Sequence, residues 1–301
     1  MNHLPQWHIG QMATWACLLE VQAAKVGNVH PGQSFHDLSW LDFAIAAIAI
    51  GPVFEQAQQL TLGQLILKAA EATKQVTSTN TNLGILLLLA PLAQVPDSQL
   101  ASPRQFRRAV RTLLQRTTVA DAEAVYAAIR LLAPSGMGQV PDQDLQQQPT
   151  HTLTAVMHLA RHRDLVASQY ASGFKDILVT GLTMWKSLID QMPLETAIQT
   201  LHLSYLAAWG DSLISRKLGQ PYSVKAQTMA QAVLASGWPT TRRSQQRFLK
   251  LDHWLRADGH RRNPGSTADL VAATMFASFR LGWHQGPHRT FWSDSMTGRK
   301  A

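Results

Sequence analysis

The sequence predicts an all-α protein, a single-domain bundle of many helices around a buried central helix. Apolar residues recur at helical spacing along most of the chain, capping-box pairs precede several of these segments, and no segment alternates with period two. With 301 residues, of which 46% are hydrophobic and 15% charged, the chain has enough apolar material for a sizeable core.

Local signals mark the helices in the N-terminal half. The first helix is expected between Gln6 and Lys25, where apolar residues follow helical spacing. Three capping-box pairs begin later helices: Ser39 with Asp42, Thr61 with Gln64, and Thr118 with Asp121. Pro103 begins a basic helix between the last two of these.

The central helix is expected in the stretch TNTNLGILLLLAPL, from Thr79 to Leu92. Its apolar part has no charged face and is too short to span a bilayer, so it fits the middle of a water-excluding core. Asn and Thr ahead of this run are helix-capping residues, and free backbone N–H groups collect at such an end. The polar end beside Asn80 and Asn82 therefore suits an anion.

Helical periodicity continues through the second half of the chain. Further helices are expected at Leu153 to Arg163, Phe174 to Gln191, Pro193 to Trp209, DSLISRKLG, Tyr222 to Ser236, Arg243 to Asp258, and Thr267 to Gly282. No repeat divides the chain, so we expect one domain over residues 1–301, with its core at about 7–283 and a mobile tail at 284–301.

Cysteine content and the N-terminus indicate the compartment. The single cysteine, Cys17, lies in an apolar run, where a buried and unreactive thiol is expected. The N-terminus has no basic segment leading into an apolar one, and the apolar run from Leu41 to Phe54 is too short to cross a membrane. We expect a cytoplasmic protein without membrane contact.

A formal charge of +8 favours an acidic partner or substrate. The basic residues form short clusters: Arg104, Arg107, Arg108 and Arg111; Arg242, Arg243 and Arg247; Arg256, Arg261 and Arg262. They are not interleaved with aromatic residues, and no nucleic-acid-binding motif accompanies them. Nucleic acid is therefore disfavoured, and solvated helix faces or a polyphosphate pocket explain the clusters equally well.

The common short catalytic motifs are absent from the sequence, including the P-loop, G-x-G-x-x-G, G-x-S-x-G and H-E-x-x-H. His158 and His162 have the spacing of two metal ligands on a helix, but the local sequence offers no third ligand. A metal site at this pair is disfavoured.

Polar clusters at helix ends carry the functional signal. They are Lys25, Gly27 and Asn28; Asp37; Asn80 and Asn82; Asp121 and Arg130; Arg163 and Asp164; Asp211, Arg216 and Lys217; and Asn263, Gly265, Ser266, Thr267 and Asp269. Lys and Arg neutralise phosphates, Asn side chains and helix N-termini hydrogen-bond them, and Asp holds Mg²⁺. Together these residue types are typical of a nucleoside triphosphate site.

Each residue also has a purely structural interpretation. Asn80, Thr267 and Asp211 suit ordinary helix capping, and Asp121 with Arg130 suits solvated surface charge. Residue by residue, these interpretations compete with the functional one.

Several motifs resemble those of the triphosphoribosyl-dephospho-CoA synthase family. TNTNLGILLLL and NPGSTADLVAATMF are similar to the family's T-N-T-x-x-G helix start and its C-terminal P-G-G-S-A-D-L-L-A motif. Further matches are EVQAAKVGNV, FHDLSWLDF with Asp37, SGFKDIL and DSLISRKLG. They occur in the family's order across residues 16–282, so the chain is identified as a divergent member.

The resemblance implies an all-helical enzyme that uses ATP and Mg²⁺. In that family, the 2′-hydroxyl of 3′-dephospho-CoA displaces adenine from C1 of the ATP ribose and gives a prosthetic-group precursor. Such a step needs an anchored triphosphate, charge stabilisation at the ribosyl centre, a base for the hydroxyl and a proton for adenine.

The resemblance also implies roles for individual residues. Lys25, Arg216 and Lys217 would contact phosphates, and Asn80, Asn82, Asn263 and Thr267 would lie around ribose or phosphate. The other substrate-binding candidates are Gly27, Asn28, Asp37, Arg130, Arg163, Gln169, Gly265 and Ser266. The metal or base candidates are Asp121, Asp164, Asp211 and Asp269, with Asp164 and Asp211 preferred for catalysis.

Departures from the family pattern leave the reaction open to alternatives. The family's P-K-P-G is AKVG here, Gln169 replaces a glutamate, and the T-H-G element has no counterpart. Asp164, one turn earlier, is the carboxylate expected to take over from the missing glutamate. The alternatives are a related ATP-ribose transferase acting on a pterin or furan precursor, and a non-catalytic nucleotide- or RNA-binding protein. Small nucleotides are the expected partners, and a homodimer stays open.

Overall fold

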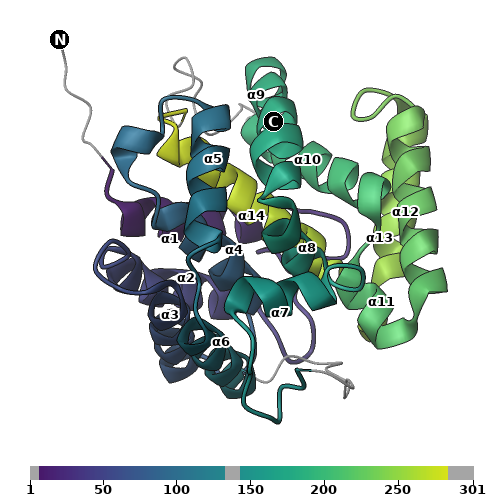
Figure 1. Ribbon diagram of the computed structural model, residues 1–301. Helices are drawn as coiled ribbons and strands as arrows, with labels where there is room; N and C mark the ends of the chain where they lie inside the picture. Colours follow the sequence, from purple (N-terminus) through teal and green to yellow (C-terminus); the bar gives the residue numbers. More distant parts are fainter. Residues whose placement is uncertain (1–6, 133–142, 284–301) are drawn as a thin grey trace.

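A computed structural model describes residues 7–132 and 143–283 of the chain. Its described residues form an all-α fold, as the sequence predicts (Figure 1). The helices are α1 (Ile9–Gln22), α2 (Trp40–Phe54), α3 (Leu62–Val76), α4 (Leu83–Ala93), α5 (Pro103–Leu114), α6 (Val119–Leu132), α7 (Leu153–Ala160), α8 (Leu165–Ser172), α9 (Leu182–Gln191), α10 (Leu194–Trp209), α11 (Ser212–Leu218), α12 (Gln220–Ala235), α13 (Arg242–Arg256) and α14 (Gly265–Arg280).

Shorter elements connect these helices. A 3-10 turn covers Asp97–Gln99, a π-helical turn covers Asp176–Gly181, and a short strand, β1, covers Ala257–His260. Helix α8 was not predicted from the sequence, and one uninterrupted helix was expected where the π-helical turn leads into α9. The tail expected to be mobile, 284–301, lies outside the described residues.

Capping pairs set the starts of three helices, as their spacing predicts. The backbone N–H of Ser39 donates to the Asp42 carboxylate at 2.7 Å, and the backbone N–H of Thr61 donates to the Gln64 side chain at 3.0 Å. At α6, the Asp121 carboxylate accepts hydrogen bonds from the backbone and hydroxyl of Thr118, each at 2.8 Å. Local sequence therefore determines where these helices begin.

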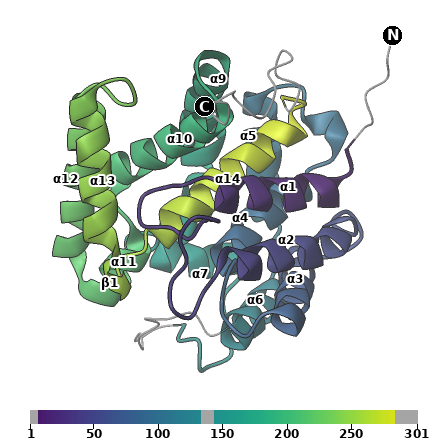
Figure 2. The ribbon, with the colours of Figure 1, turned by 180° about the vertical axis from the view of Figure 1, so that it is seen from behind.

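Two helices form the centre of the molecule. Every residue of α4 except Gly84 is buried, which confirms the predicted central helix. Helix α14 contacts α4 and is buried along nearly its whole length. Helix α1 also packs against α14, as the view from behind shows (Figure 2). Since both central helices are apolar, their polar first turns are held in fixed positions by the core.

A second, smaller apolar cluster supports the C-terminal helices. It includes Leu206 on α10, Ile214 on α11, Ala230 on α12 and Leu251 on α13. Figure 1 shows these helices, in green, grouped at one side of α14. The grouping places the end of α13 and the strand β1 beside the start of α14.

Cys17 is buried, as expected, and burial followed by the charge of Glu20 raises the pKa of its thiol. Among the described helices, none is long and apolar enough to cross a membrane.

Candidate active site

A cavity of about 810 Å³ lies where the first turns of α4 and α14 come together. Polar residues reach it from the loop before α4, from α11 and from the start of α14, whereas α6 and α7 contribute mainly apolar side chains such as Val125, Ile129 and Val156. Its size is within the range of ligand sites in proteins. The cavity thus offers a polar region and an apolar region to one ligand or to two.

The start of α4 is shaped by its Asn-rich loop. The Asn80 side chain accepts a hydrogen bond from the backbone N–H of Leu83 at 3.1 Å, and Asn82 bonds the Thr73 hydroxyl at 3.1 Å. Asn80 therefore caps the helix, while Asn82 is hydrogen-bonded to a residue of α3. Both residues also line the cavity, so the capping and the functional interpretations are compatible at this point.

The loop after α1 is tied to the start of α14. The Asn28 side-chain N–H donates to the Asn263 side-chain oxygen at 2.6 Å, and the Arg256 guanidinium donates to the Asn28 backbone carbonyl at 2.6 Å. Asn28 Oδ1 is buried without a hydrogen-bond partner among the described residues. An unpaired buried acceptor is costly, so this oxygen is suited to a hydroxyl or amino donor of a ligand.

The basic side of the cavity belongs to α11. Arg216 Nη1 lies 3.3 Å from Asp164 Oδ2, and within the described part of the chain Arg216 Nε has no hydrogen-bond partner. Lys217 Nζ donates to the His260 carbonyl at 3.4 Å. Burial, followed by the charge of Arg216, lowers the pKa of Lys217, so an anion in the cavity would stabilise both cations.

The acidic side of the cavity includes Asp269, which lies against Gly84. Burial raises the pKa of Asp269 well above its usual value, and the charges of Glu20, Asp211 and Asp164 raise it further. A carboxyl group whose pKa is moved toward neutrality can accept or donate a proton during a reaction.

Asp211 lies behind the cavity wall and joins two helix starts. One carboxylate oxygen accepts from the backbone N–H groups of Leu213 and Ile214 at 2.9 and 3.0 Å. The other accepts from the backbone N–H and the hydroxyl of Thr267 at 2.8 and 2.9 Å. Asp211 is 1% exposed, so its carboxylate acts within the protein and is not presented to a ligand in this structure.

The structure brings most of the sequence-predicted site residues together at this cavity. Those that line it are Asn28, Asp37, Asn80, Asn82, Arg163, Asp164, Arg216, Lys217, Asn263, Gly265, Ser266 and Asp269.

The other predicted residues lie elsewhere. Lys25 is buried with its ammonium 2.9 Å from Glu20, and Gly27 donates its backbone N–H to Asp252. Arg130 donates to the Leu145 carbonyl, and Gln169 donates to the Asp176 carboxylate. The Thr267 hydroxyl donates to Asp211, and Asp121 caps α6 and accepts from the Gly63 backbone N–H. Burial makes the side chains of Lys25 and Gln169 unavailable to a ligand here, and Arg130 is not among the residues that line the cavity. Asp121 is likewise occupied, because two backbone and two hydroxyl donors lower its pKa although burial acts to raise it.

Several lining residues were not predicted. They include Glu20, Lys74, Ser215 and His260. Glu20 follows an apolar stretch of α1, and an acidic residue in such a stretch could have indicated a buried functional or paired carboxylate. His260 precedes Asn263 by only three positions, but no neighbouring residue in the sequence indicates a partner for it.

Comparisons with known proteins agree on one family. The sequence profile described as ATP:dephospho-CoA triphosphoribosyl transferase matches residues 6–287. The fold is similar to a crystal structure of a protein from Archaeoglobus fulgidus assigned as a triphosphoribosyl-dephospho-CoA synthase, with 25% identity and a TM-score of 0.62 over 79% of this chain and 98% of that chain. Among curated proteins, none matches significantly.

The all-α fold and the family match define a transferase of coenzyme biosynthesis. The chain belongs to the ATP:dephospho-CoA triphosphoribosyl transferase family, for which ATP is a substrate.

Proposed function

We propose that this chain carries out the family reaction at the cavity, with the 2′-hydroxyl of 3′-dephospho-CoA attacking C1 of the ATP ribose. The new bond joins the hydroxyl oxygen to C1, the bond from C1 to adenine breaks, and adenine leaves with a proton. The observation that supports this most is the meeting of two helix starts, two cations and Asp269 in one cavity.

The triphosphate would lie on the basic side of the cavity. Arg216 and Lys217 supply positive charge there, and the first turns of α4 and α14 supply backbone N–H groups and the favourable end of each helix dipole. Arg216 Nε has no hydrogen-bond partner within the described residues, so it would be one donor for a phosphate oxygen.

The proton of the attacking hydroxyl would pass to the ionised carboxylate of Asp269, and the departing adenine would take its proton from solvent water. The raised pKa of Asp269 makes its ionised form a stronger base than an ordinary aspartate, and its carboxyl group lines the cavity. This differs from the preference for Asp164 and Asp211 expected from the sequence, because Asp211 is enclosed and Asp164 faces Arg216.

Mg²⁺ fits the acidic side of the cavity. Asp164 offers a carboxylate oxygen, and the mutual repulsion that raises the pKa of Asp269 would be relieved by a nearby cation. When bound, Mg²⁺ would neutralise charge on the triphosphate.

The apolar region favours an acceptor with a long non-polar portion. Side chains such as Ile129, Leu153 and Met157 line it, and the methylene and methyl groups of the pantetheine arm of dephospho-CoA would pack against them. A flat pterin or furan precursor would use the same region, so the acceptor has to be decided by assay. A cytoplasmic location is a further expectation of this proposal.

One assay tests the reaction. The protein is incubated with ATP, Mg²⁺ and dephospho-CoA, and adenine and the adduct are followed by mass. We expect both products, and we expect Asp269→Asn and Asp164→Asn each to lower turnover by at least ~100-fold with ATP binding largely kept. Asn at position 164 can still accept from the Ala167 backbone N–H, which Asp164 now bonds at 2.9 Å, so the start of α8 should survive.

The outcomes separate the alternatives. ATP binding with adenine release only when a pterin or furan acceptor is supplied would move the proposal to the related transferase. ATP binding without any adenine release would favour a non-catalytic nucleotide-binding protein, and the absence of ATP binding would defeat both enzyme proposals. Asp190→Asn, on an exposed part of α9, is the charge-matched control and should behave as wild type.

A further inference from the structure

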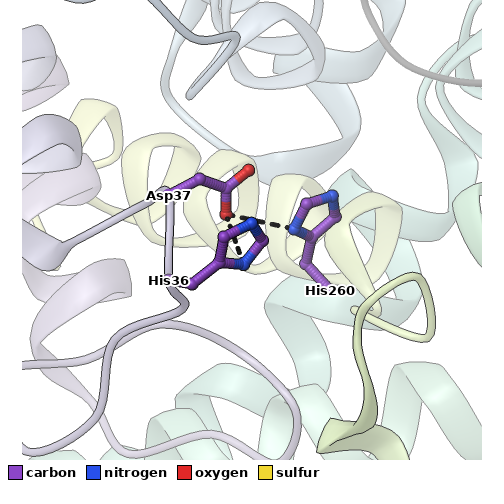
Figure 3. A group of neighbouring side chains, drawn as sticks. All are labelled: His36, Asp37 and His260. Carbon is purple, nitrogen blue, oxygen red and sulfur yellow. Dashed lines mark ion pairs between the residues drawn. The ribbon is translucent and has the colours of Figure 1, made fainter.

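Three side chains with metal-binding atoms meet at the mouth of the cavity. His36 and Asp37 come from the loop between α1 and α2, and His260 ends strand β1 (Figure 3). One ligand atom from each lies within 4.8 Å of the other two. Asp37 and His260 also line the cavity, whereas His36 is largely exposed. In the described part of the chain, these residues form the one cluster of three His, Cys, Asp or Glu side chains with such spacing.

The distances from the Asp37 carboxylate to the two imidazole nitrogens fit a small cation. Asp37 Oδ1 lies 3.4 Å from His36 Nδ1 and 3.2 Å from His260 Nδ1. Metal–ligand bonds of about 2.0–2.2 Å place neighbouring ligands of a tetrahedral ion roughly 3.3–3.6 Å apart. The two imidazole rings are nearly parallel, with centroids 5.9 Å apart and an interplanar angle of 5°.

The contact between His260 and Asp37 is an ion-pair contact and does not have the geometry of a hydrogen bond. His260 Nδ1 is buried and has no hydrogen-bond partner among residues 7–132 and 143–283, although it lies near the Asp37 carboxylate. A buried ring nitrogen without a partner is costly, and a cation between the nitrogen and the carboxylate would remove that cost.

The surroundings hold His260 in place. Lys217 donates to its carbonyl group, and the ring of Phe35 meets the imidazole edge-on at 5.8 Å. The neighbouring guanidinium groups have other partners, because Arg261 lies 3.5 Å from Asp258 and Arg262 lies over the Trp254 ring. Their repulsion of a cation is therefore reduced.

We propose that His36, Asp37 and His260 form a binding site for a divalent transition-metal ion at the mouth of the cavity. Two imidazoles and one carboxylate suit zinc, cobalt or manganese, whereas Mg²⁺ prefers oxygen ligands alone. Three protein ligands leave at least one coordination position for water or a ligand group. This site uses none of the residues expected to hold Mg²⁺, and its existence does not depend on the proposed reaction.

Metal titration without nucleotide tests the proposal. The chelator-treated full chain is titrated with Co²⁺ while its visible absorption is recorded, and with Zn²⁺ by calorimetry. We expect one bound equivalent, and at least ~10-fold weaker binding in His36→Gln, Asp37→Asn and His260→Gln, since even changes beyond the direct ligands cost 10–100-fold. His36→Gln is the key variant, because a side chain that is 79% exposed can be replaced without disturbing the core.

The double variant His158→Gln, His162→Gln is the matched control. That pair has metal-ligand spacing in the sequence, but it belongs to no such three-residue cluster within the described residues. Unchanged binding in this control, with loss in the three single variants, supports the site. Absence of a bound equivalent in wild type, equal affinity in folded His36→Gln, or loss of binding in the control would overturn the proposal. Because the experiment measures metal binding and no turnover, its outcome can be interpreted even if the protein does not catalyse the proposed reaction.

Discussion

Gly84, in the first turn of α4, lies so close to Asp269 of α14 that a Cβ atom at position 84 would overlap the Asp269 carboxylate. This close approach explains why a glycine stands at the end of the T-N-T-x-x-G motif in this chain. Only a residue without a side chain lets the α14 carboxylate reach the start of the central helix.

We expect Gly84→Ala to displace Asp269 and reduce turnover. Overpacking lowers the free energy of unfolding by about 1–3 kcal/mol, whereas the higher helix propensity of alanine raises it by at most about 1 kcal/mol. The variant should therefore also be less stable than wild type. Denaturant unfolding and adenine release measure the two effects. The same change in an Asp269→Ala background should cost less, because the overlapping carboxylate is gone. Equal costs in both backgrounds would contradict the contact, and Gly32→Ala in the loop after α1 serves as control.

Asp269→Asn should separate stability from activity. Because burial and neighbouring carboxylates raise the pKa of Asp269 in the folded state, the folded protein binds its proton more tightly than the unfolded chain does. The free energy of unfolding should therefore fall as the pH rises from the unfolded pKa through the folded one. Thermal unfolding across this pH range should show a smaller loss of stability for Asp269→Asn than for wild type. The variant should be more stable than wild type at neutral pH. A parallel pH dependence in both proteins would contradict the raised pKa.

Lys217→Ala should weaken ATP binding by about 10-fold or more, since a hydrogen bond to a charged group contributes about 1.5–3 kcal/mol. The pKa of Lys217 is lowered by burial and by Arg216, so wild type should lose ATP affinity as the pH rises through that value. Lys217→Arg keeps the charge and should move this loss to higher pH. Calorimetry at several pH values measures both effects, and unchanged affinity in folded Lys217→Ala would remove the phosphate role.

Asp211→Ala should act on stability. It leaves the N–H groups of Leu213, Ile214 and Thr267 without their acceptor, and each buried unsatisfied group costs about 1–3 kcal/mol. We expect a loss of about 3 kcal/mol or more in denaturant unfolding. Asp164→Ala, which removes a partly exposed cap of α8, should cost only about 1 kcal/mol. Wild-type stability with abolished turnover in Asp211→Ala would instead indicate a direct role in the chemistry.

Local sequence determined the helices and the family of this protein. Capping pairs such as Thr61 with Gln64, and the uncharged apolar run of α4, act over a few residues, so their outcome can be predicted without knowing the fold. Most of the residues that the polar motifs at helix starts predicted for the site do line the cavity.

The tertiary structure decided which carboxylates and histidines can meet a ligand. Asp211 and Asp269 both follow from motifs at helix starts, but the packing of α11 against α14 encloses Asp211 and leaves Asp269 at the cavity. His36 and His260 lie far apart in the sequence and become neighbours only because the loop after α1 packs beside β1. Their position depends on side-chain contacts between distant segments, and no local propensity encodes such contacts.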